Sequence, residues 1–159
     1  MNKILIAYYS YSGNTGKIAS LIQKQTGGTL FEIIPVSPYP AGYNEAVKQA
    51  KTEIRASFHP ELKTKTDNIE SYDIIFIGSP NWWSTIAPPV ASFLSEYDLS
   101  GKTIVPFCTH GGGGHASLFR DTAALCTHSD VSKGFEVFGS GNSDVLDKIS
   151  SWLAEIGIK

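Results

Sequence analysis

The sequence predicts a doubly wound α/β fold, in which helices cover both faces of a five-stranded parallel sheet. The first observation is a set of five runs typical of strands: residues 4–9, 29–34, 74–77, 103–108 and 135–138. The second is that helical patterns separate these runs, in the order β-α-β-(α)-β-α-β-α-β-α. Strands that alternate with helices pair in parallel and are covered on both faces. We expect one domain over residues 1–159.

The composition of the strands predicts their order in the sheet. The first, third and fourth contain continuous apolar runs, which are typical of strands buried on both faces. The second and fifth alternate instead, with Glu32 and Glu136 midway, so one side of each is partly exposed to water. These two belong at the edges, which fits the order 2-1-3-4-5. Pro106 removes a ladder donor from an inner strand, so we expect a bulge or the strand's end there.

Four stretches carry apolar residues at the spacing of one helix face. Pro88 and Pro89 precede the second stretch and suit the first turn of a helix. The four sets are Ile18, Leu21, Ile22 and the polar exception Gln25; Val90, Phe93, Leu94 and Tyr97; Ala116, Phe119, Ala123 and Cys126; and Val145, Ile149, Trp152, Leu153 and Ile156.

Residues 35–65 form the least regular segment of the chain. We interpret residues 39–43 as a loop, 44–56 as a short helix and 58–65 as irregular. The segment is long for a connection between two strands, which makes it a candidate cover for a ligand.

The overall composition excludes several classes of function. Hydrophobic residues make up 42% and charged residues 18% of the chain, which is typical of a globular protein. The net charge is −2 with no basic run, so we expect neither nucleic acid nor a membrane surface as a partner. Without a recognisable signal peptide or membrane span, we expect a cytoplasmic protein. The two cysteines, Cys108 and Cys126, are interpreted as buried free thiols rather than metal ligands.

In an open parallel sheet, ligands bind at the carboxyl ends of the strands where the strand order reverses. The loop after the first strand contains Ser10, Tyr11, Ser12, Gly13, Asn14 and Thr15. It opens a helix, whose N-terminus presents free N–H groups and about half a positive charge to a phosphate. An ordinary capped helix start is the alternative, since serine and threonine are common caps. Three serine or threonine hydroxyls and one amide in six residues are more than a cap needs.

The loop after the third strand contains Ser79, Pro80, Asn81, Trp82, Trp83 and Ser84. Two adjacent tryptophans cannot both face one core layer, so a planar ligand stacked on an indole would explain them. The alternative is that one tryptophan packs down while the other covers a helix end.

The loop after the fourth strand contains Thr109, His110, Gly111, Gly112, Gly113, Gly114 and His115. The glycines let the backbone approach a flat ligand closely and leave N–H donors unobstructed. A flexible linker is the alternative. Either histidine could be catalytic or bind a metal, but we interpret each as a surface histidine beside glycines.

With the three loops placed, the sequence resembles the flavodoxin family over nearly its whole length. Ser10-x-Ser12-Gly13-Asn14-Thr15 resembles the family's phosphate signature, and residues 75–83 and 106–112 resemble a bacterial flavodoxin-like subfamily. Residues 39–53 are similar to that group's insertion. The resemblance implies a flavodoxin-like fold and non-covalent flavin mononucleotide (FMN). It implies that the first loop holds the phosphate and that Pro80, Asn81, Trp82, Trp83 and Thr109–Gly113 surround the isoalloxazine.

Two departures from the family bear on function. Well-studied flavodoxins usually flank the flavin ring with a tryptophan and a tyrosine, whereas this chain has glycines where that tyrosine would lie. Flavodoxins also tend to be strongly acidic, and this chain is not. Two functions therefore stay open: an electron carrier between redox partner proteins, and an FMN-dependent NAD(P)H oxidoreductase acting on quinones or similar small acceptors. We assign no catalytic residue.

Overall fold

The computed structural model describes residues 3–158, and a parallel sheet forms its centre. The strand order is β2-β1-β3-β4, with β5 and β6 both paired to the outer side of β4. The order 2-1-3-4-5 is therefore confirmed, with a sixth strand added. The strands are β1 (Ile4–Tyr8), β2 (Thr29–Glu32), β3 (Ile74–Pro80), β4 (Thr103–His110), β5 (Asp130–Val131) and β6 (Phe135–Phe138).

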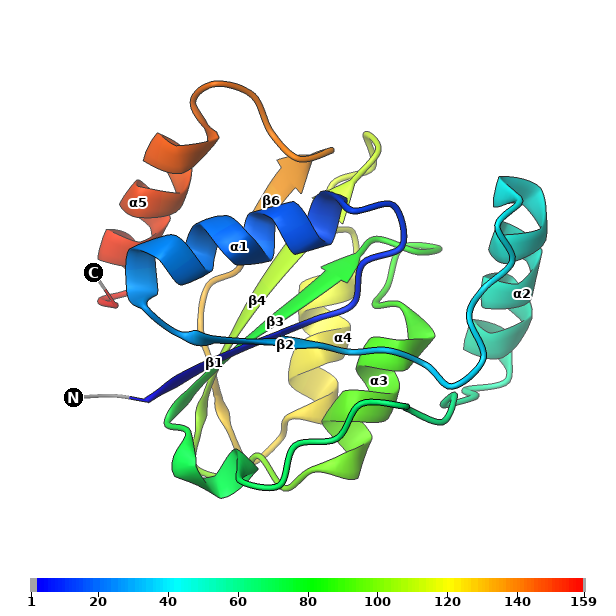
Figure 1. Ribbon diagram of the computed structural model, residues 1–159, viewed down its shortest axis with the longest axis horizontal. Helices are drawn as coiled ribbons and strands as arrows, with labels where there is room; N and C mark the ends of the chain where they lie inside the picture. The colour runs from blue at the N-terminus through cyan, green and yellow to red at the C-terminus, as the bar shows by residue number, and fades with distance from the viewer. Residues whose placement is uncertain (1–2, 159) are drawn as a thin grey trace.

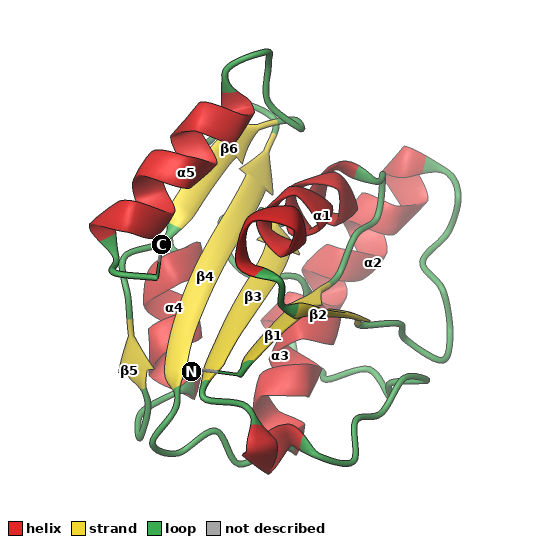
Figure 2. Ribbon diagram, turned by 60° about the vertical axis from the view of Figure 1, so that its left-hand side comes forward, coloured by secondary structure: helices red, strands yellow, loops and turns green. Residues whose placement is uncertain are grey.

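Helices cover both faces of this sheet, as Figure 2 shows: α1 and α5 lie on one face, and α3 and α4 on the other. The predicted alternation of strands and helices is confirmed, because each crossover between parallel strands carries its connection over one face. Within residues 3–158, no helix is long and apolar enough to cross a membrane. The helices are α1 (Asn14–Thr26), α2 (Tyr43–Arg55), the short 3₁₀ helix η1 (Ile69–Ser71), α3 (Pro88–Glu96), α4 (Leu118–Leu125) and α5 (Val145–Glu155).

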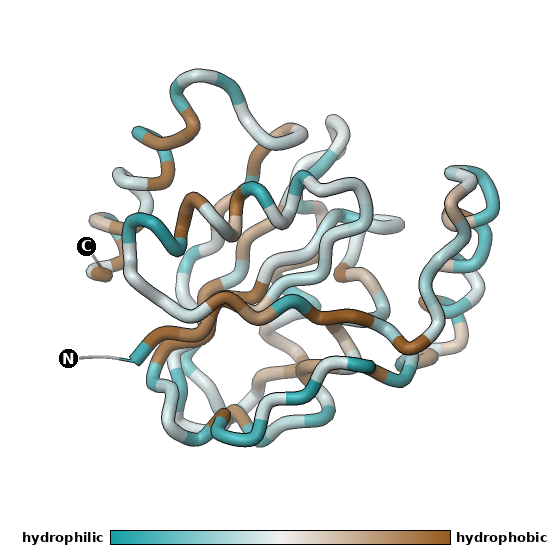
Figure 3. The backbone as a smooth tube through the Cα atoms, viewed as in Figure 1, coloured by the Kyte–Doolittle hydropathy of each residue, from teal (hydrophilic) through white to brown (hydrophobic). Residues whose placement is uncertain are grey.

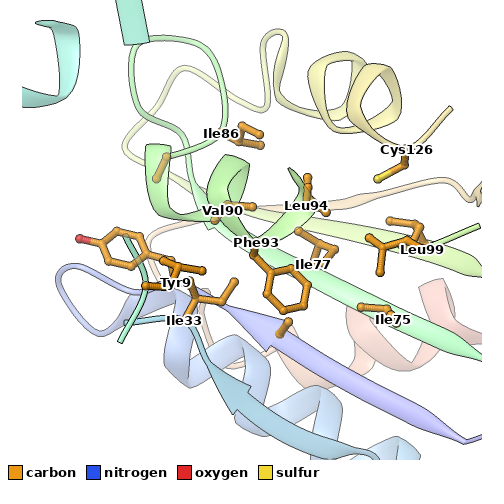
Figure 4. Packing of buried hydrophobic residues seen from close by; sticks show 14 of the residues in the cluster. Tyr9, Ile33, Ile75, Ile77, Ile86, Val90, Phe93, Leu94, Leu99 and Cys126 are labelled. Carbon is orange, nitrogen blue, oxygen red and sulfur yellow. The ribbon is translucent and has the colours of Figure 1, made fainter. Parts of the chain in front are cut away.

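Two hydrophobic cores lie on opposite faces of the sheet because successive strand side chains point in opposite directions. Leu5 faces the core beneath α3 and α4, whereas Ile6 and Phe76 face the core beneath α1 and α5. Phe93 of α3 is completely buried and packs in the first core near Ile77 (Figure 4). Each large side chain buried in this way contributes about 1.5–3 kcal/mol. The hydropathy colouring in Figure 3 accordingly places the brown, apolar chain along the central strands.

Pro106 lies inside β4, so the expectation that the strand bulges or ends there is wrong. The pairing of β3 with β4 runs without interruption through Ile77 and Pro106. The interruption lies instead in the strand position next to β4, which is divided into two strands: β5 pairs with the start of β4 and β6 pairs with its end. The backbone carbonyls of Ile104 and His110 accept hydrogen bonds from the outer side of β4. Because backbone polar groups of every second residue in a strand point to the same side, the nitrogen of Pro106 also faces this outer side. The missing donor of the proline therefore faces the gap between β5 and β6.

Two further expectations need correction. First, β3 and β4 extend to Pro80 and His110, so residues expected in loops pair as strand ends, Pro80 with Thr109. Second, the buried face of α4 consists of Leu118 and Thr122, followed by Cys126 just beyond the helix. The expected face was wrong at Ala116, which is exposed. A pattern of apolar residues does not include Thr122. Its hydroxyl donates to the carbonyl of Leu118 at 2.8 Å, so burial of this side chain leaves no hydrogen bond unmade.

The segment from residue 35 to residue 65 contains α2, in agreement with the short helix expected there. Figure 1 shows α2 standing apart from the other helices, beyond the loops that follow β1 and β3. The two ends of the 35–65 segment are held together, because Pro35 and Leu62 form an antiparallel bridge and the Val36 N–H donates to the Glu61 carbonyl at 2.8 Å. The helix is thereby held at the carboxyl edge of the sheet.

Candidate functional site

The three loops predicted from the sequence meet at the carboxyl edge of the sheet, where the chain passes from β1 to a helix on one face and from β3 to a helix on the other. Thr15 at the start of α1 and Thr109 in β4 are both buried, and their hydroxyl oxygens lie 2.8 Å apart. Asn81 joins the other two loops, because its backbone N–H donates to the Thr109 carbonyl at 2.9 Å and its Nδ2 donates to the Gly114 carbonyl at 2.7 Å. Direct hydrogen bonds therefore hold the three loops in one place.

The loop after β1 is shaped by the hydroxyl of Ser10. This oxygen accepts the backbone N–H groups of Gly13 and Gly16, each at 3.1 Å. Gly13 precedes α1 with φ of 97°, a left-handed conformation that glycine adopts without strain. The first bond of the helix then runs from Lys17 N–H to the Gly13 carbonyl at 3.0 Å. The chain curls around Ser10 before it enters the helix.

The N-terminus of α1 is suited to a phosphate. The backbone N–H groups of Ser12, Asn14 and Thr15 meet no protein acceptor among residues 3–158. The first turn of the helix carries no acidic residue, so nothing there opposes an anion. Ser12 is exposed and its hydroxyl has no partner within the described chain, whereas the hydroxyl of Thr15 is already bonded to Thr109. Free N–H groups at the positive end of a helix match the donor set that binds phosphate.

The loop after β3 turns through a two-residue hairpin. Trp82 and Thr85 exchange backbone hydrogen bonds of 3.0 and 3.2 Å. The two residues between them, Trp83 and Ser84, both have positive φ, 56° and 69°. This is the signature of a type I′ turn, in which Asn-Gly is the preferred pair. Neither residue here is glycine or asparagine, so the turn carries backbone strain beside the candidate site.

The two tryptophans have different environments. Trp82 packs inward, edge-on to the rings of Tyr9, Tyr11 and Tyr39, with centroids 5.5, 5.6 and 4.9 Å away. Trp83 points toward α2 and is 47% exposed. One indole thus packs down, as in the alternative interpretation, whereas the other contacts Val47 within α2 rather than a helix end.

Tyr9 and Tyr39 belong to this aromatic cluster, although the sequence pattern did not mark them. Burial raises the pKa of both hydroxyls. For Tyr39 the next cause is Glu53 of α2, whose carboxylate accepts the phenol O–H at 2.5 Å. Both phenols therefore stay protonated at neutral pH. The hydrogen bond of Tyr39 with Glu53 joins positions 14 residues apart. The only sequence feature that pointed to this region was the irregular segment that contains both residues.

Trp83 connects the loop to α2. Its Nε1–H donates to the carbonyl of Val47 at 3.0 Å, and the Lys51 ammonium lies 4.8 Å from its ring centroid. A pocket of about 250 Å³ lies between helix and loop. Its lining consists of Tyr11, Tyr43, Ala46, Val47, Ala50, Asn81, Trp82 and Trp83.

The glycine loop after β4 leaves room beside the other two loops. A side-chain carbon at Gly111 would meet nothing within 4 Å, and one at Gly113 would meet only Nδ2 of Asn81, at 3.7 Å. Neither glycine has a positive φ, so neither the packing nor the backbone conformation requires it. Gly112 and Gly114 do adopt positive φ, 125° and 68°. Glycine at positions 111 and 113 would let a ligand approach the backbone closely, because no side chain stands in the way.

His115 anchors the far end of this loop. Its backbone N–H donates to Oε2 of Glu136 at 2.8 Å, and its ring Nδ1 contacts the same oxygen. The ring stacks on Phe119, with centroids 4.4 Å apart. Burial alone would raise the pKa of Glu136, but the bonds and charge from His115 outweigh it and hold this pKa below its ordinary value. His110 plays a smaller local part, since its Nδ1 accepts the Gly112 N–H at 3.0 Å.

Asn81 carries an unsatisfied atom at the centre of the site. The Gly114 carbonyl can only accept a hydrogen bond, so the amide nitrogen must face it and Oδ1 must face away. This oxygen is buried and has no partner among residues 3–158. A buried acceptor without a donor costs about 1–3 kcal/mol. A ligand that offers an N–H group to this loop would remove that cost. The described residues contain no cluster of three or more histidine, cysteine or acidic side chains able to hold a metal ion.

The family model described as flavodoxin matches residues 3–156. The chain belongs to the flavodoxin family. Among curated relatives, Flavodoxin 1 of Escherichia coli (strain K12) is 27% identical over 134 residues, which cover 79% of this chain. An NAD(P)H dehydrogenase (quinone) of Cupriavidus metallidurans is 28% identical over 141 residues, again covering 79% of this chain. This flavodoxin-family chain spans about 58% of the length of the E. coli relative and 66% of the other.

Two solved structures resemble the whole domain. A candidate flavoprotein from Bacteroides eggerthii is 29% identical with a TM-score of 0.87, and the match covers 100% of both chains. A flavoprotein from Lactobacillus acidophilus, solved in complex with FMN, is 27% identical with a TM-score of 0.75 and covers 94% of this chain and 99% of its own. The flavodoxin-like fold expected from the sequence is confirmed.

Proposed function

We propose that this flavodoxin-family chain binds FMN without a covalent bond and transfers electrons through it. The observation that carries the proposal is the N-terminus of α1, where free N–H groups of Ser12, Asn14 and Thr15 lie beside an exposed hydroxyl and no acidic side chain. The solved relative in complex with FMN supports the same cofactor.

In this proposal the phosphate binds to the loop of residues 10–15 and the isoalloxazine lies near the other two loops. The hydroxyls of Ser10 and Ser12 would add to the backbone donors. Asn81 would accept from an N–H of the ring, which would satisfy its buried Oδ1. When bound, FMN supplies reversible electron transfer, and the protein supplies orientation and electrostatics. We infer roles near the ring for Pro80, Trp82, Trp83, Thr109, His110, Gly111, Gly112 and Gly113.

Titration with FMN and with riboflavin tests the phosphate site. We expect one FMN per chain and much weaker riboflavin binding, because each bond to a charged group contributes about 1.5–3 kcal/mol. Ser12→Ala should weaken FMN by about tenfold per lost bond and leave riboflavin nearly unchanged. Ser20→Ala, the same change inside α1 and away from its N-terminus, is the matched control and should alter neither affinity. Equal affinities for FMN and riboflavin would contradict the proposal.

A second function, reduction of a small acceptor at the expense of NAD(P)H, is favoured by the pocket beside Trp83. A carrier that serves only partner proteins has no need of an apolar pocket at this position. The curated quinone dehydrogenase among the relatives is compatible with this function. Turnover assays of the FMN-loaded protein with NADH or NADPH and a quinone separate the two functions: rapid turnover favours the enzyme, and its absence favours the carrier.

A further inference from the structure

The glycine loop after β4, residues 111–114, depends on very few hydrogen bonds for its conformation. Glycine has more backbone freedom than any other residue, so a run of glycines loses much entropy when it is held in one conformation. Among residues 3–158, one backbone N–H of this loop meets an acceptor: that of Gly112, which donates to Nδ1 of His110 at 3.0 Å. Asn81 holds the end of the loop at the Gly114 carbonyl. His110 therefore fixes the part of the loop next to the sheet.

His110 is itself fixed by the end of the sheet. It is the last residue of β4, it pairs with Phe138 of β6, and its carbonyl accepts the Gly139 N–H at 2.8 Å. Its ring lies edge-on to the ring of Phe138, with centroids 5.9 Å apart. Gly112 lies beside the same phenyl ring, since a Cβ at this position would be 3.8 Å from Phe138. Nδ1 of His110 is thus a positioned acceptor.

The hydrogen bond to Gly112 requires a neutral imidazole. A backbone N–H can only donate, so Nδ1 of His110 accepts through its lone pair and the proton of the neutral ring is on Nε2. An imidazolium carries a proton on both nitrogens and cannot accept. The gain of one proton therefore breaks the bond. Histidine side chains ordinarily change charge between about pH 5 and 8.

Two titratable groups lie close to the ring of His110. Glu136 is two residues before Phe138 on β6, so its side chain lies on the same face of the sheet as His110. His115 follows the glycine loop, and both histidines interact electrostatically with the Glu136 carboxylate. His115 occupies Oε2 of this carboxylate, whereas Oε1 has no hydrogen-bond partner within the described chain. A protonated His110 therefore gains an attractive neighbour as it loses the bond to Gly112.

We propose that His110 is a positioning residue whose neutral ring holds the glycine loop ready for the flavin and whose protonation releases the loop. The ring acts through the backbone of Gly112 and not by contact with the cofactor. A loop that is held in place before binding lowers the ordering cost of binding, so FMN affinity should fall as His110 gains a proton. The consequence for FMN rests on the proposed function; the hydrogen bond and its dependence on protonation do not.

Amide NMR spectra of the full chain without FMN, recorded from about pH 8 to about pH 5, test the hydrogen bond. The Gly112 amide signal should shift with the same midpoint as the His110 ring, because the donor loses its acceptor in the same step. In His110→Asn, the side-chain oxygen can replace Nδ1 and does not titrate, so the Gly112 signal should stay nearly constant. His128→Asn is the matched control. It changes an exposed histidine beside Gly101, before the start of β4, and should leave the Gly112 profile unaltered.

Calorimetric titration with FMN at about pH 8 and about pH 5.5 tests the consequence for binding. Leucine cannot accept a hydrogen bond, so His110→Leu should bind FMN about three- to tenfold more weakly than the wild type at the higher pH. His110→Asn should stay within about twofold of the wild type there. A phosphate monoester also gains a proton near a pH of about 6, which weakens FMN in every variant. The readout is therefore a difference: the wild type should lose about three- to tenfold more affinity in acid than His110→Asn does.

Each remaining outcome decides one question. A Gly112 signal that does not follow the His110 ring overturns the proposal, and so do equal acid losses of FMN affinity in the wild type and His110→Asn. An extra acid loss that disappears in His115→Asn instead also overturns it, because the other end of the loop would then be responsible. Wild-type protein that shows the Gly112 shift but binds no FMN refutes the proposed function and leaves the hydrogen bond assigned. If circular dichroism shows that His110→Leu does not fold, the comparison of the wild type with His110→Asn carries the test.

Discussion

Ser84→Gly tests whether the turn after β3 stores backbone strain. Ser84 is exposed, and its hydroxyl has no hydrogen bond among residues 3–158, so the substitution removes no hydrogen bond. Its φ of 69° lies in the left-handed region, which costs a residue with a Cβ about 1–2 kcal/mol. Glycine does not pay this cost, but it loses about 0.5–1 kcal/mol more conformational entropy on folding. The balance predicts a gain in stability of about 0.5–1 kcal/mol.

Urea denaturation measures this gain as a higher midpoint with an unchanged slope. For a chain of this size the melting temperature should rise by about 1–4 °C. Ser151→Gly is the matched control, because Ser151 is exposed in the interior of α5, where glycine disfavours the helix by about 0.5 kcal/mol. The two substitutions should therefore act in opposite directions. If both lower the stability, the strain assigned to the turn is absent.

Three further predictions follow from other contacts. Thr15→Val and Thr109→Val should each cost about 1–3 kcal/mol of stability, and the double variant should cost less than their sum, because each single change strands one buried hydroxyl. The pKa of Glu136 is lowered in the folded protein, so its contribution to stability is present above an unfolded pKa of about 4.3 and is lost as pH falls through the lower folded value. The loss of stability in acid should therefore be smaller in Glu136→Gln than in the wild type, as measured by denaturation at several pH values. Burial raises the thiol pKa of Cys108 to about 12 and of Cys126 to about 11, so neither free cysteine should react with a thiol reagent near a pH of about 8 until urea unfolds the chain.

Much of the fold could be predicted because its signals are local. Continuous apolar runs marked the inner strands, and Glu32 and Glu136 marked the edges. The short strand at Asp130–Val131 could not be found, because two residues carry no periodicity. The buried face of α4 was misassigned because Thr122 is polar in composition but satisfied within its own helix. Local hydrogen bonding decided the last case, and a hydrophobic pattern does not record it.

The candidate site was predictable in its position but not in its internal contacts. Topology alone brings the three loops together, since the carboxyl ends of parallel strands share one edge. The hydrogen bond from Trp83 to Val47 joins positions 36 residues apart, and the sequence around neither residue predicts it. The contact of His115 with Glu136 likewise depends on β6 lying beside β4. Roles that depend on partners distant in the sequence need the three-dimensional structure.

The division of the outermost position into β5 and β6 also bears on how the molecule avoids self-association. An open sheet has two edges whose unpaired backbone groups can recruit a strand from another chain. Here one edge consists of pieces two and four residues long, separated by a break, and the other is the four-residue β2. Glu136 within β6 and Glu32 at the end of β2 place a carboxylate on each edge, where a second copy would meet a like charge. Short, interrupted and negatively charged edges give an incoming strand no continuous register to extend, so the sheet resists growth by edge-to-edge pairing.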